Sequence, residues 1–247
     1  MHLHRSNRTE ALVNRLVEVV SRPLADPLEP ECIVVQGRGM ERWLAMELAQ
    51  KLGAWANPWF PFPRRLLELA FRRAMPEAED DATAGFEPGR LAFAIAAVLA
   101  DRVETPGYEP LARYVARGER AARLVDLSVR VAEAFDRYLV YRPDLIEGWD
   151  SGRDDGWESL LWREVTARLG REHPPARARR FLELARRGVL RLEGFPSRVC
   201  LFGISTLPPR YVELFAALAR QIEVHLFMLS PSREFWADVR SRREQLR

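Results

Sequence analysis

The sequence contains a single lysine, Lys51, and this residue decides whether the chain can bind nucleotide phosphates. A P-loop needs a glycine-rich turn followed by lysine and Ser or Thr, so that the ammonium contacts the β- and γ-phosphates. Lys51 instead lies between Gln50 and Leu52 in an amphipathic pattern, without a glycine-rich turn before it. The sequence therefore predicts no ATPase motif. A nuclease centre with Asp or Glu two residues before a lysine is also excluded, because position 49 is alanine.

Cysteine and histidine, the other common metal ligands and nucleophiles, are sparse. The two cysteines, Cys32 and Cys200, each begin an apolar run, which predicts buried thiols in a reducing compartment. No Cys-x-x-Cys pair occurs and the histidines are scattered, so the sequence predicts no zinc site. No nucleophile is placed to complete a catalytic triad, so we expect no enzyme activity from this chain by itself. The histidines are His2, His4, His173 and His225.

Arginine supplies almost all of the positive charge. Of the 38 basic residues one is lysine, which leaves 37 arginines against 35 acidic residues and a net charge of +3. So small a net charge predicts local rather than global binding to nucleic acid. Guanidinium groups suit DNA, because they bind phosphate and guanine edges bidentately and stack on bases. A GC-rich genome also favours arginine codons, so the composition leaves both explanations open.

The elements that would position these residues are typical of an α/β domain interrupted by helices. Strand-like apolar runs lie at 32–36, 198–204 and 223–228, with a weaker alternation at 2–4. Helical periodicity covers 7–20, 40–52, 210–221 and, apart from loops at 77–81 and 151–156, the stretch 64–188. We therefore expect an α/β fold with a parallel sheet and an inserted helical subdomain. The expected boundaries are 1–63 and 191–247 for the α/β domain and 64–190 for the insertion.

Residues 32–53 have the strand, glycine turn and helix of a nucleotide-binding unit. The turn from Gln36 to Arg42 has this topology but lacks the phosphate-binding lysine. The longest apolar run, 91–100, is about half of what a bilayer requires, and the N-terminus has no apolar signal region. We expect a cytoplasmic protein without membrane contact. The chain stops at Arg247 without a capping element, so we expect it to be the front piece of a larger protein.

Several short motifs occur in an order and spacing that resemble a known family. The most specific is the block from Phe135 to Asp144, which reads Phe-Asp-Arg-Tyr-Leu-Val-Tyr-Arg-Pro-Asp. The motifs together resemble the N-terminal region of RecC, the gamma subunit of exodeoxyribonuclease V (RecBCD), over essentially the whole chain. The others are Ser6-Asn7-Arg8, Val34-Val35-Gln36, Gly39-Met40, Trp43-Leu44, Phe202-Gly203-Ile204-Ser205 with Leu207-Pro208-Pro209, and Glu223-Val224-His225-Leu226.

The resemblance implies a RecA-like, superfamily 1 helicase-like domain that has lost its ATPase motifs. It implies a non-catalytic subunit in double-strand break repair and recombination, which holds RecB-like and RecD-like partners, channels the DNA strand ending 3′ and scans it for a Chi-type hotspot. No cofactor is expected in this chain, since ATP and Mg²⁺ would be used by the partner subunits. The alternative is a helicase-like protein-interaction module that contacts DNA only through backbone charge. Retention of a sequence preference at raised salt would distinguish the two.

The resemblance also implies DNA-binding positions, and several of them depart from the best-known member of the family. Gln36, Asp136 and Arg142 are kept, and Arg177 matches loosely. Because the departures cluster on residues expected to touch bases, we expect this chain to read a different hotspot sequence or none. The remaining positions are Arg38 for Thr, Arg42 for Gln, Phe62 for Leu, Glu68 for Trp, Glu133 for Asp, and Arg137 within the specific block.

Two local patterns bear on these positions. Pro143 disfavours helix at the preceding residue, which predicts that the Arg142 guanidinium lies at a helix end. By spacing alone it would bind C-terminal carbonyls or extend from a packed face, whereas the resemblance favours DNA. The stiff aromatic and proline loop at 54–63 suits either stacking on unpaired bases or covering the core. We expect Trp55 and Phe60 to cover the core, and leave Trp59 and Phe62 open.

Overall fold

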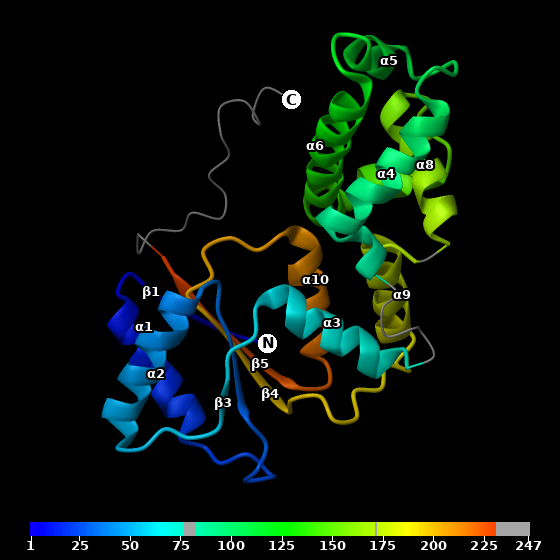
Figure 1. Ribbon diagram of the computed structural model, residues 1–247. Coiled ribbons are helices and arrows are strands. Elements are labelled where there is room, and N and C mark those ends of the chain that lie inside the picture. Colours follow the sequence, from blue (N-terminus) through cyan, green and yellow to red (C-terminus); the bar gives the residue numbers. More distant parts are fainter. Residues whose placement is uncertain (77–82, 171, 231–247) are drawn as a thin grey trace, which may run out of the picture. The chain divides into compact units, whose positions relative to one another are not determined.

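The computed structural model describes residues 1–76, 83–170 and 172–230 (Figure 1). The acidic residues of the loop at 77–81 and the segment from Pro231 to Arg247 lie outside the described residues. The chain divides into two compact units. The first comprises Met1–Ala70, Glu193–Leu207 and the residues from Phe215 onward, and the second comprises Phe71–Leu192 and Pro208–Leu214.

The first unit is built on a five-stranded sheet in the order β1-β5-β4-β2-β3, in which every neighbouring pair is parallel. The predicted α/β fold with a parallel sheet is therefore confirmed. The apolar runs at 32–36, 198–204 and 223–228 and the alternation at 2–4 each contain a strand. The strands are β1 (His2–Ser6), β2 (Glu31–Val34), β3 (Pro58–Trp59), β4 (Arg198–Phe202) and β5 (Glu223–Leu229).

The edge strand β3 was not predicted, because the sequence indicated only a rigid loop at 54–63. It pairs with β2 through two residues, Glu31 beside Pro58 and Cys32 beside Trp59. Proline has no N–H to donate and is therefore tolerated on an edge strand. Two residues are too few to show any strand periodicity, so this part of the sequence carries no strand signal.

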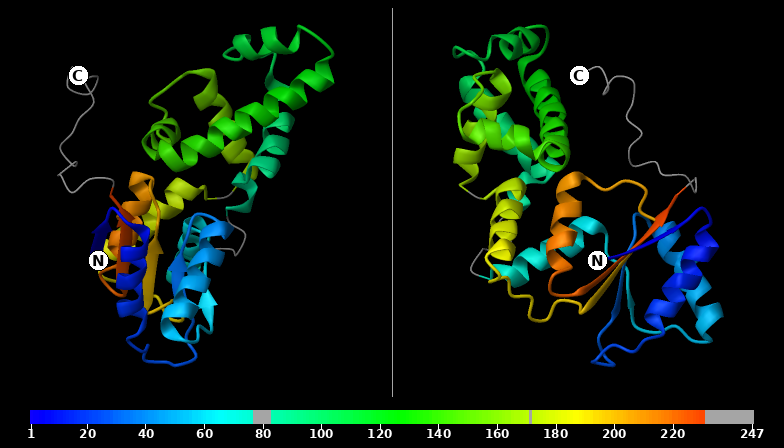
Figure 2. Two further views of the ribbon diagram at one scale, coloured as in Figure 1. Left: turned by 90° about the vertical axis from the view of Figure 1, so that its left-hand side faces the viewer. Right: turned by 180° about the vertical axis from the view of Figure 1, so that it is seen from behind.

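Both faces of the central strands are buried. Helices α1 (Thr9–Val20) and α2 (Arg38–Leu52) lie together on one face (Figures 1 and 2). Their apolar residues pack against alternate residues of the strands, including Ile33, Cys200 and Phe227. In the central strands β2 and β4 the residues between these positions, Val34 and Leu201, are also buried, so both faces of these two strands are covered. Both cysteines are free buried thiols whose pKa is raised by burial.

A buried ion pair joins β2 to β4 at the amino end of the sheet. The register that sets Cys32 beside Val199 also places Glu31 beside Arg198. The side chain of Arg198 is 3% exposed and that of Glu31 14% exposed. Arg198 Nε donates to Glu31 Oε2 over 3.3 Å, and Nη2 donates both to Glu31 Oε1 and to the carbonyl of Arg22. All three contacts hold one guanidinium inside the sheet.

Gly203 turns the chain at the end of β4, and its substitution gives a first prediction. Its φ is +65°, and a Cβ there would lie 3.3 Å from Met40 Cε. We expect Gly203→Ala to lower the free energy of unfolding by about 1–3 kcal/mol, because alanine is strained in the left-handed region. Gly39→Ala is the matched control, since no atom lies within 4 Å of a Cβ there and its φ is not positive. Urea unfolding measures both, and equal stability of the two variants would contradict the prediction.

The second unit is helical. Its core is formed mainly between α4 and α6 and includes a cluster of aromatic rings: Phe135 lies 5.6 Å from Trp149 and 5.5 Å from Trp162 between ring centroids. No helix among the described residues has both the length and the apolar character needed to cross a bilayer. The elements are η1 (Ala84–Phe86), α4 (Pro88–Arg102), α5 (Glu109–Val115), α6 (Arg120–Tyr141), α7 (Pro143–Asp150), α8 (Trp157–Leu169) and α9 (Pro174–Arg186).

The compact units divide the chain a few residues away from the predicted domain boundaries. The sequence placed the helical insertion at 64–190. Residues 64–70, the first part of α3 (Pro63–Ala74), belong instead to the unit with the sheet. Residues 208–214, in the first part of α10 (Pro209–Leu218), belong to the helical unit although they follow β4 in the chain.

A carboxylate in the helical unit binds two aromatic donors. Ala176 N–H donates to His173 Nδ1, so the proton of that ring lies on Nε2, which donates to Asp150 Oδ2 over 2.8 Å. Trp162 Nε1 donates to Asp150 Oδ1 over 3.0 Å. Desolvation acts to raise the pKa of Asp150, but the hydrogen bonds from His173 and Trp162 outweigh it, and the pKa is lowered.

The lowered pKa of Asp150 predicts a pH-dependent contribution to stability. A depressed carboxyl pKa stabilises the fold above the unfolded value of about 3.9, and this stabilisation is lost as the pH falls through the folded value. We expect Asp150→Asn to lower the free energy of unfolding by about 1–3 kcal/mol at pH 7 and by less near pH 3. Urea unfolding at both pH values checks this, with exposed Asp155→Asn as the control. A cost that is the same at both pH values would contradict it.

Candidate nucleic-acid interface

Three adjacent strands of the sheet end at the same edge, and predicted DNA-binding residues follow two of them. Gln36 follows β2 and Phe62 follows β3, and the loop after β4 carries Thr206. Beyond the strands, Val35 N–H donates to the carbonyl of Pro61 over 3.2 Å, which sets the Gln36 and Phe62 backbones side by side. Gln36 Nε2 donates to the carbonyl of Thr206 over 3.1 Å. The glutamine therefore lies between the ends of the two neighbouring strands.

Helix α2 begins at this edge and adds positive charge to it. Gly37 is the N-cap and no side chain caps the helix, so its first N–H groups have no acceptor within the helix. Such a helix end favours anions, because free N–H groups and the positive end of the helix dipole point the same way. No atom lies within 4 Å of a Cβ built at Gly37 or Gly39. No neighbouring atom therefore blocks access to the backbone of this turn.

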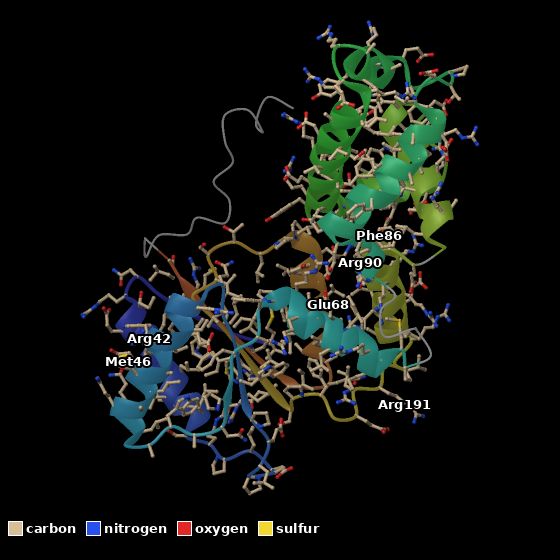
Figure 3. The ribbon with its side chains drawn as sticks, in the orientation of Figure 1. Arg42, Met46, Glu68, Phe86, Arg90 and Arg191 are labelled. Atoms are coloured by element: carbon tan, nitrogen blue, oxygen red, sulfur yellow. The ribbon has the colours of Figure 1, made fainter. Side chains whose placement is uncertain are left out.

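Two arginines lie on the first turns of α2. Arg38 and Arg42 are four residues apart, so they lie on one side of the helix, and both are exposed. Neither forms an ion pair with any residue that the structure describes. Figure 3 shows Arg42 with Met46, one turn further on and 56% exposed, on the outer side of α2. Both guanidiniums are therefore available to an external anion.

The other predicted DNA-binding residues of this unit are Glu68 and Phe62. Glu68, on α3, binds Arg64 Nε over 3.0 Å (Figure 3 labels the glutamate). Phe62 is 44% exposed, so its ring is available for stacking. Trp55 and Phe60 pack against the core beneath α1 and α2, which confirms the prediction that they cover it. Trp59 is partly buried.

A second set of predicted residues lies on α6 and at its end, in the helical unit. Phe135 is buried there, while Glu133 and Arg137 are exposed and Asp136 is partly buried. Arg142 ends α6 and precedes α7, which confirms its predicted position at a helix end.

The guanidinium of Arg142 has a local partner. Its Nε and Nη2 each donate to a carboxylate oxygen of Asp144 over 3.3 Å. This hydrogen bond lowers the pKa of Asp144 and raises that of Arg142. Both side chains are largely exposed, so water screens the pair. A DNA phosphate would have to compete with Asp144 for Arg142, which it would not have to do at Arg38 or Arg42.

Arg177 differs from the rest because it is buried. The residue is 2% exposed on α9, and its guanidinium lies 6.0 Å from the centroid of the Phe71 ring. This position suits packing with an aromatic face rather than contact with an external ligand.

The structure thus sorts the predicted residues into two surface sets, the ion-paired Glu68 on α3, and one buried residue, Arg177. Gln36, Phe62 and the N-terminal turns of α2 share the carboxyl edge of the sheet, and the α6 residues belong to the other compact unit. Sequence reasoning missed Thr206, which positions the amide of Gln36. No signal pointed to it, because the contact uses a backbone carbonyl 170 residues away.

Comparison with known proteins gives one matching family model and several similar proteins. The family described as "RecC, N-terminal domain" matches residues 1–247. The chain is 34% identical over 253 residues to the RecBCD enzyme subunit RecC of Escherichia coli (strain K12), covering 97% of this chain and 22% of that protein. It is 31% identical over 255 residues to the RecBCD enzyme subunit RecC of Mycolicibacterium smegmatis, covering 100% of this chain and 22% of that protein. The chain spans about a fifth of the length of these relatives.

Proposed function

Since the chain belongs to the RecC N-terminal domain family, we propose that it acts as part of the RecC subunit of a RecBCD-type enzyme in DNA repair and recombination. In this proposal the chain is a non-catalytic, helicase-like module of RecA-like type that works in the cytoplasm beside RecB-like and RecD-like subunits. Those partners use ATP and Mg²⁺, in keeping with the absence of a P-loop lysine from this sequence. The chain guides the single strand ending 3′.

One observation carries the DNA-binding part of the proposal. Arg38 and Arg42 lie exposed, without ion pairs among the described residues, on a helix that begins at the carboxyl edge of the sheet. Ligands of open α/β sheets bind in the crevice at this edge. The free helix N-terminus and two guanidiniums together suit a DNA phosphate. The position that would hold nucleotide phosphates in a motor domain holds the DNA backbone here.

In this proposal Gln36 and Phe62 contact the bases at this edge. An amide can bind a base edge through two hydrogen bonds, and it does so best when the side chain is held in place. The hydrogen bond to Thr206 holds the Gln36 amide, and half-exposed Phe62 offers a stacking surface beside it. Arg137, Glu133, Asp136 and Arg142 form a second, weaker contact of mixed charge, and buried Arg177 and ion-paired Glu68 serve the fold.

Binding to single-stranded oligonucleotides of different sequence, measured over a salt series, tests the proposal. Phosphate contacts weaken uniformly as salt rises, whereas base contacts keep their preference. We expect a preference among sequences that persists at raised salt. Uniform weak binding to all sequences would favour backbone charge alone.

The hotspot itself is tested in the assembled complex. Arg38, Arg42, Phe62, Glu68 and Glu133 differ from the best-known member of the family, so we propose that a sequence other than the standard Chi octamer is read, or none. Pausing or nuclease attenuation on DNA libraries decides this. Attenuation at the standard octamer with unchanged preference would contradict it.

The second candidate is a protein-interaction module that contacts DNA only through backbone charge. It is favoured by apolar side chains exposed on α6, where Val125 is 60%, Val129 44% and Tyr141 59% exposed. Isolated exposed apolar residues are common, but Val125 and Val129 are four residues apart and share one side of the helix, which suits a partner surface. The salt series above separates the two candidates.

A further inference from the structure

Three of the four histidines lie together where β1 pairs with β5. The parallel register sets His2 beside His225, and His4, two residues further along β1, faces the same side. The ring of His225 stacks with those of both, with centroids 4.7 Å from His2 and 5.3 Å from His4. The expectation of no zinc site rested on scattered histidines. That reason was wrong, because the fold brings together residues about 220 positions apart.

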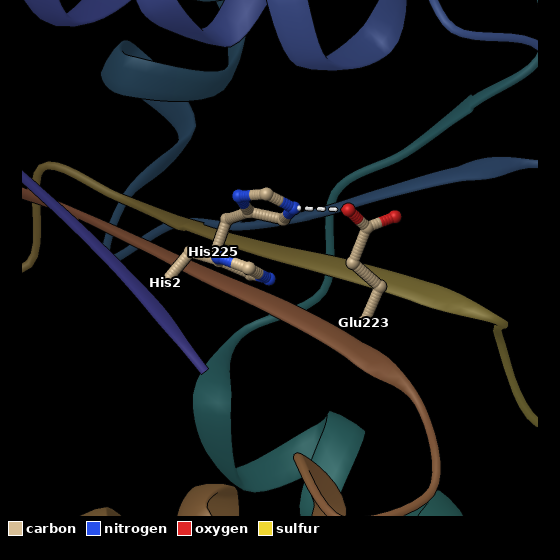
Figure 4. Close-up of side chains that lie close together, drawn as sticks. All are labelled: His2, Glu223 and His225. Atoms are coloured by element: carbon tan, nitrogen blue, oxygen red, sulfur yellow. Dashed lines mark hydrogen bonds and ion pairs between the residues drawn. The ribbon is translucent and has the colours of Figure 1, made fainter.

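Glu223, the first residue of β5, adds a carboxylate to this cluster. His225 Nε2 lies 2.9 Å from Glu223 Oε1, as the dashed line in Figure 4 marks. One potential ligand atom from each of His2, Glu223 and His225 lies within 4.8 Å of the others. Tetrahedral zinc with bonds of about 2.0–2.1 Å needs ligand atoms about 3.3 Å apart. His2 is exposed, so small rotations of its side chain can close that difference.

The surroundings leave His225 ready to act as a ligand. The ring has two tautomers: Nε2–H can donate to Glu223, or Nδ1–H can donate to His4 Nε2 over 3.0 Å, and the second tautomer leaves the Nε2 lone pair for a metal. Histidines that bind metals commonly donate their other ring N–H in this way.

The carboxylate of Glu223 has a second partner. Arg22 Nη2 donates to its Oε1 over 2.7 Å. Two imidazoles and one carboxylate are a ligand set typical of zinc and related divalent ions.

We propose that His2, Glu223 and His225 bind one divalent transition-metal ion, with Zn²⁺ as the reference ion, and that the ion fastens β1 to β5. The three side chains gather on one face of these strands (Figure 4). Among the described strands β1 lies at the edge of the sheet with β5 as its one neighbour, so a metal that joins the two strengthens this pairing. His225 and Glu223 lie in the amino-terminal half of β5, toward the edge opposite Gln36. Metal binding is therefore separate from the proposed DNA contact.

Titration of the full chain without a polyhistidine tag tests the proposal. We expect one equivalent of Co²⁺ to give visible d–d absorption bands, and one equivalent of Zn²⁺ to displace them. His2→Phe keeps a ring to stack on His225 but removes the ligand nitrogen, and Glu223→Gln removes the charge. Each should weaken Zn²⁺ binding by at least about tenfold, since even outer-shell changes cost about 10–100-fold. The control Leu3→Phe adds an aromatic ring at the next, exposed position and should bind as the unaltered chain does.

Two further readouts separate metal binding from folding. Circular dichroism shows whether each variant is folded, and amide hydrogen exchange reports on β1. In the unaltered chain Zn²⁺ should slow exchange in β1, and EDTA should reverse the effect, whereas His2→Phe should show neither change. Absence of saturable binding, or equal Zn²⁺ affinity in the unaltered chain and both variants, overturns the site. Binding without added protection of β1 overturns the proposed fastening of this strand.

Discussion

Replacing both Arg38 and Arg42 by glutamine is expected to weaken binding to single-stranded DNA about tenfold at physiological salt. Each phosphate contact on a single strand contributes about 0.7 to the slope of log affinity against log salt, so the slope should fall by about 1.4. Neither guanidinium has an ion pair among the described residues, so the change leaves no carboxylate without a partner. Fluorescence anisotropy of a labelled oligonucleotide over a salt series measures both quantities.

The matched control removes the same amount of charge elsewhere on the α/β unit. Lys51 lies at the opposite end of α2, about 20 Å from Arg38 along the helix axis, and Arg15 lies on α1. The double variant Arg15→Gln/Lys51→Gln should keep nearly the original slope. If both double variants lose affinity equally, binding depends on overall charge, and the carboxyl edge of the sheet has no special role.

Removing Glu31 is expected to have the largest effect on stability. Glu31→Ala should lower the free energy of unfolding by about 3–5 kcal/mol, because it leaves the buried Arg198 guanidinium without its carboxylate. The remaining hydrogen bond, to the Arg22 carbonyl, does not neutralise the charge. Urea unfolding measures the loss, and hydrogen exchange in β2 and β4 assigns it to the sheet.

The double variant Glu31→Leu/Arg198→Met tests the reason for that loss. A buried ion pair replaced by apolar residues of similar volume is often neutral, whereas a single deletion leaves an uncompensated charge. We therefore expect the double variant to recover most of the stability. Arg15→Ala breaks an exposed pair with Glu18 and should cost less than about 1 kcal/mol. A double variant as unstable as Glu31→Ala would show that packing, and not the buried charge, is responsible.

Elements with strong local signals could be predicted from the sequence. The strands β2, β4 and β5 are short runs rich in apolar and β-branched residues, and each was expected within a few residues of its observed bounds. The junction of α6 and α7 was expected at Arg142, because proline at 143 restricts the residue before it. The turn after β2 was expected because Gly37 and Gly39 are a local turn signal.

Features that depend on distant contacts could not be predicted. No sequence pattern in β1 or β5 predicts that these two strands pair with each other. This pairing is what brings the histidines together. Arginine is rarely buried, so nothing in the sequence around Arg177 indicated that α9 would enclose it. The position of the Gln36 side chain likewise depends on a carbonyl in a different part of the chain.

The position of β5 in the sheet also bears on how the chain folds during synthesis. β5 lies between β1 and β4, so β1 has no neighbouring strand until residues 223–229 have been made. At about 5–20 residues per second, about 10–45 seconds separate the synthesis of β1 from that of β5. The helical unit, apart from 208–214, is complete well before then and can collapse on its own local contacts. β1 therefore keeps an unpaired edge until β5 has been made.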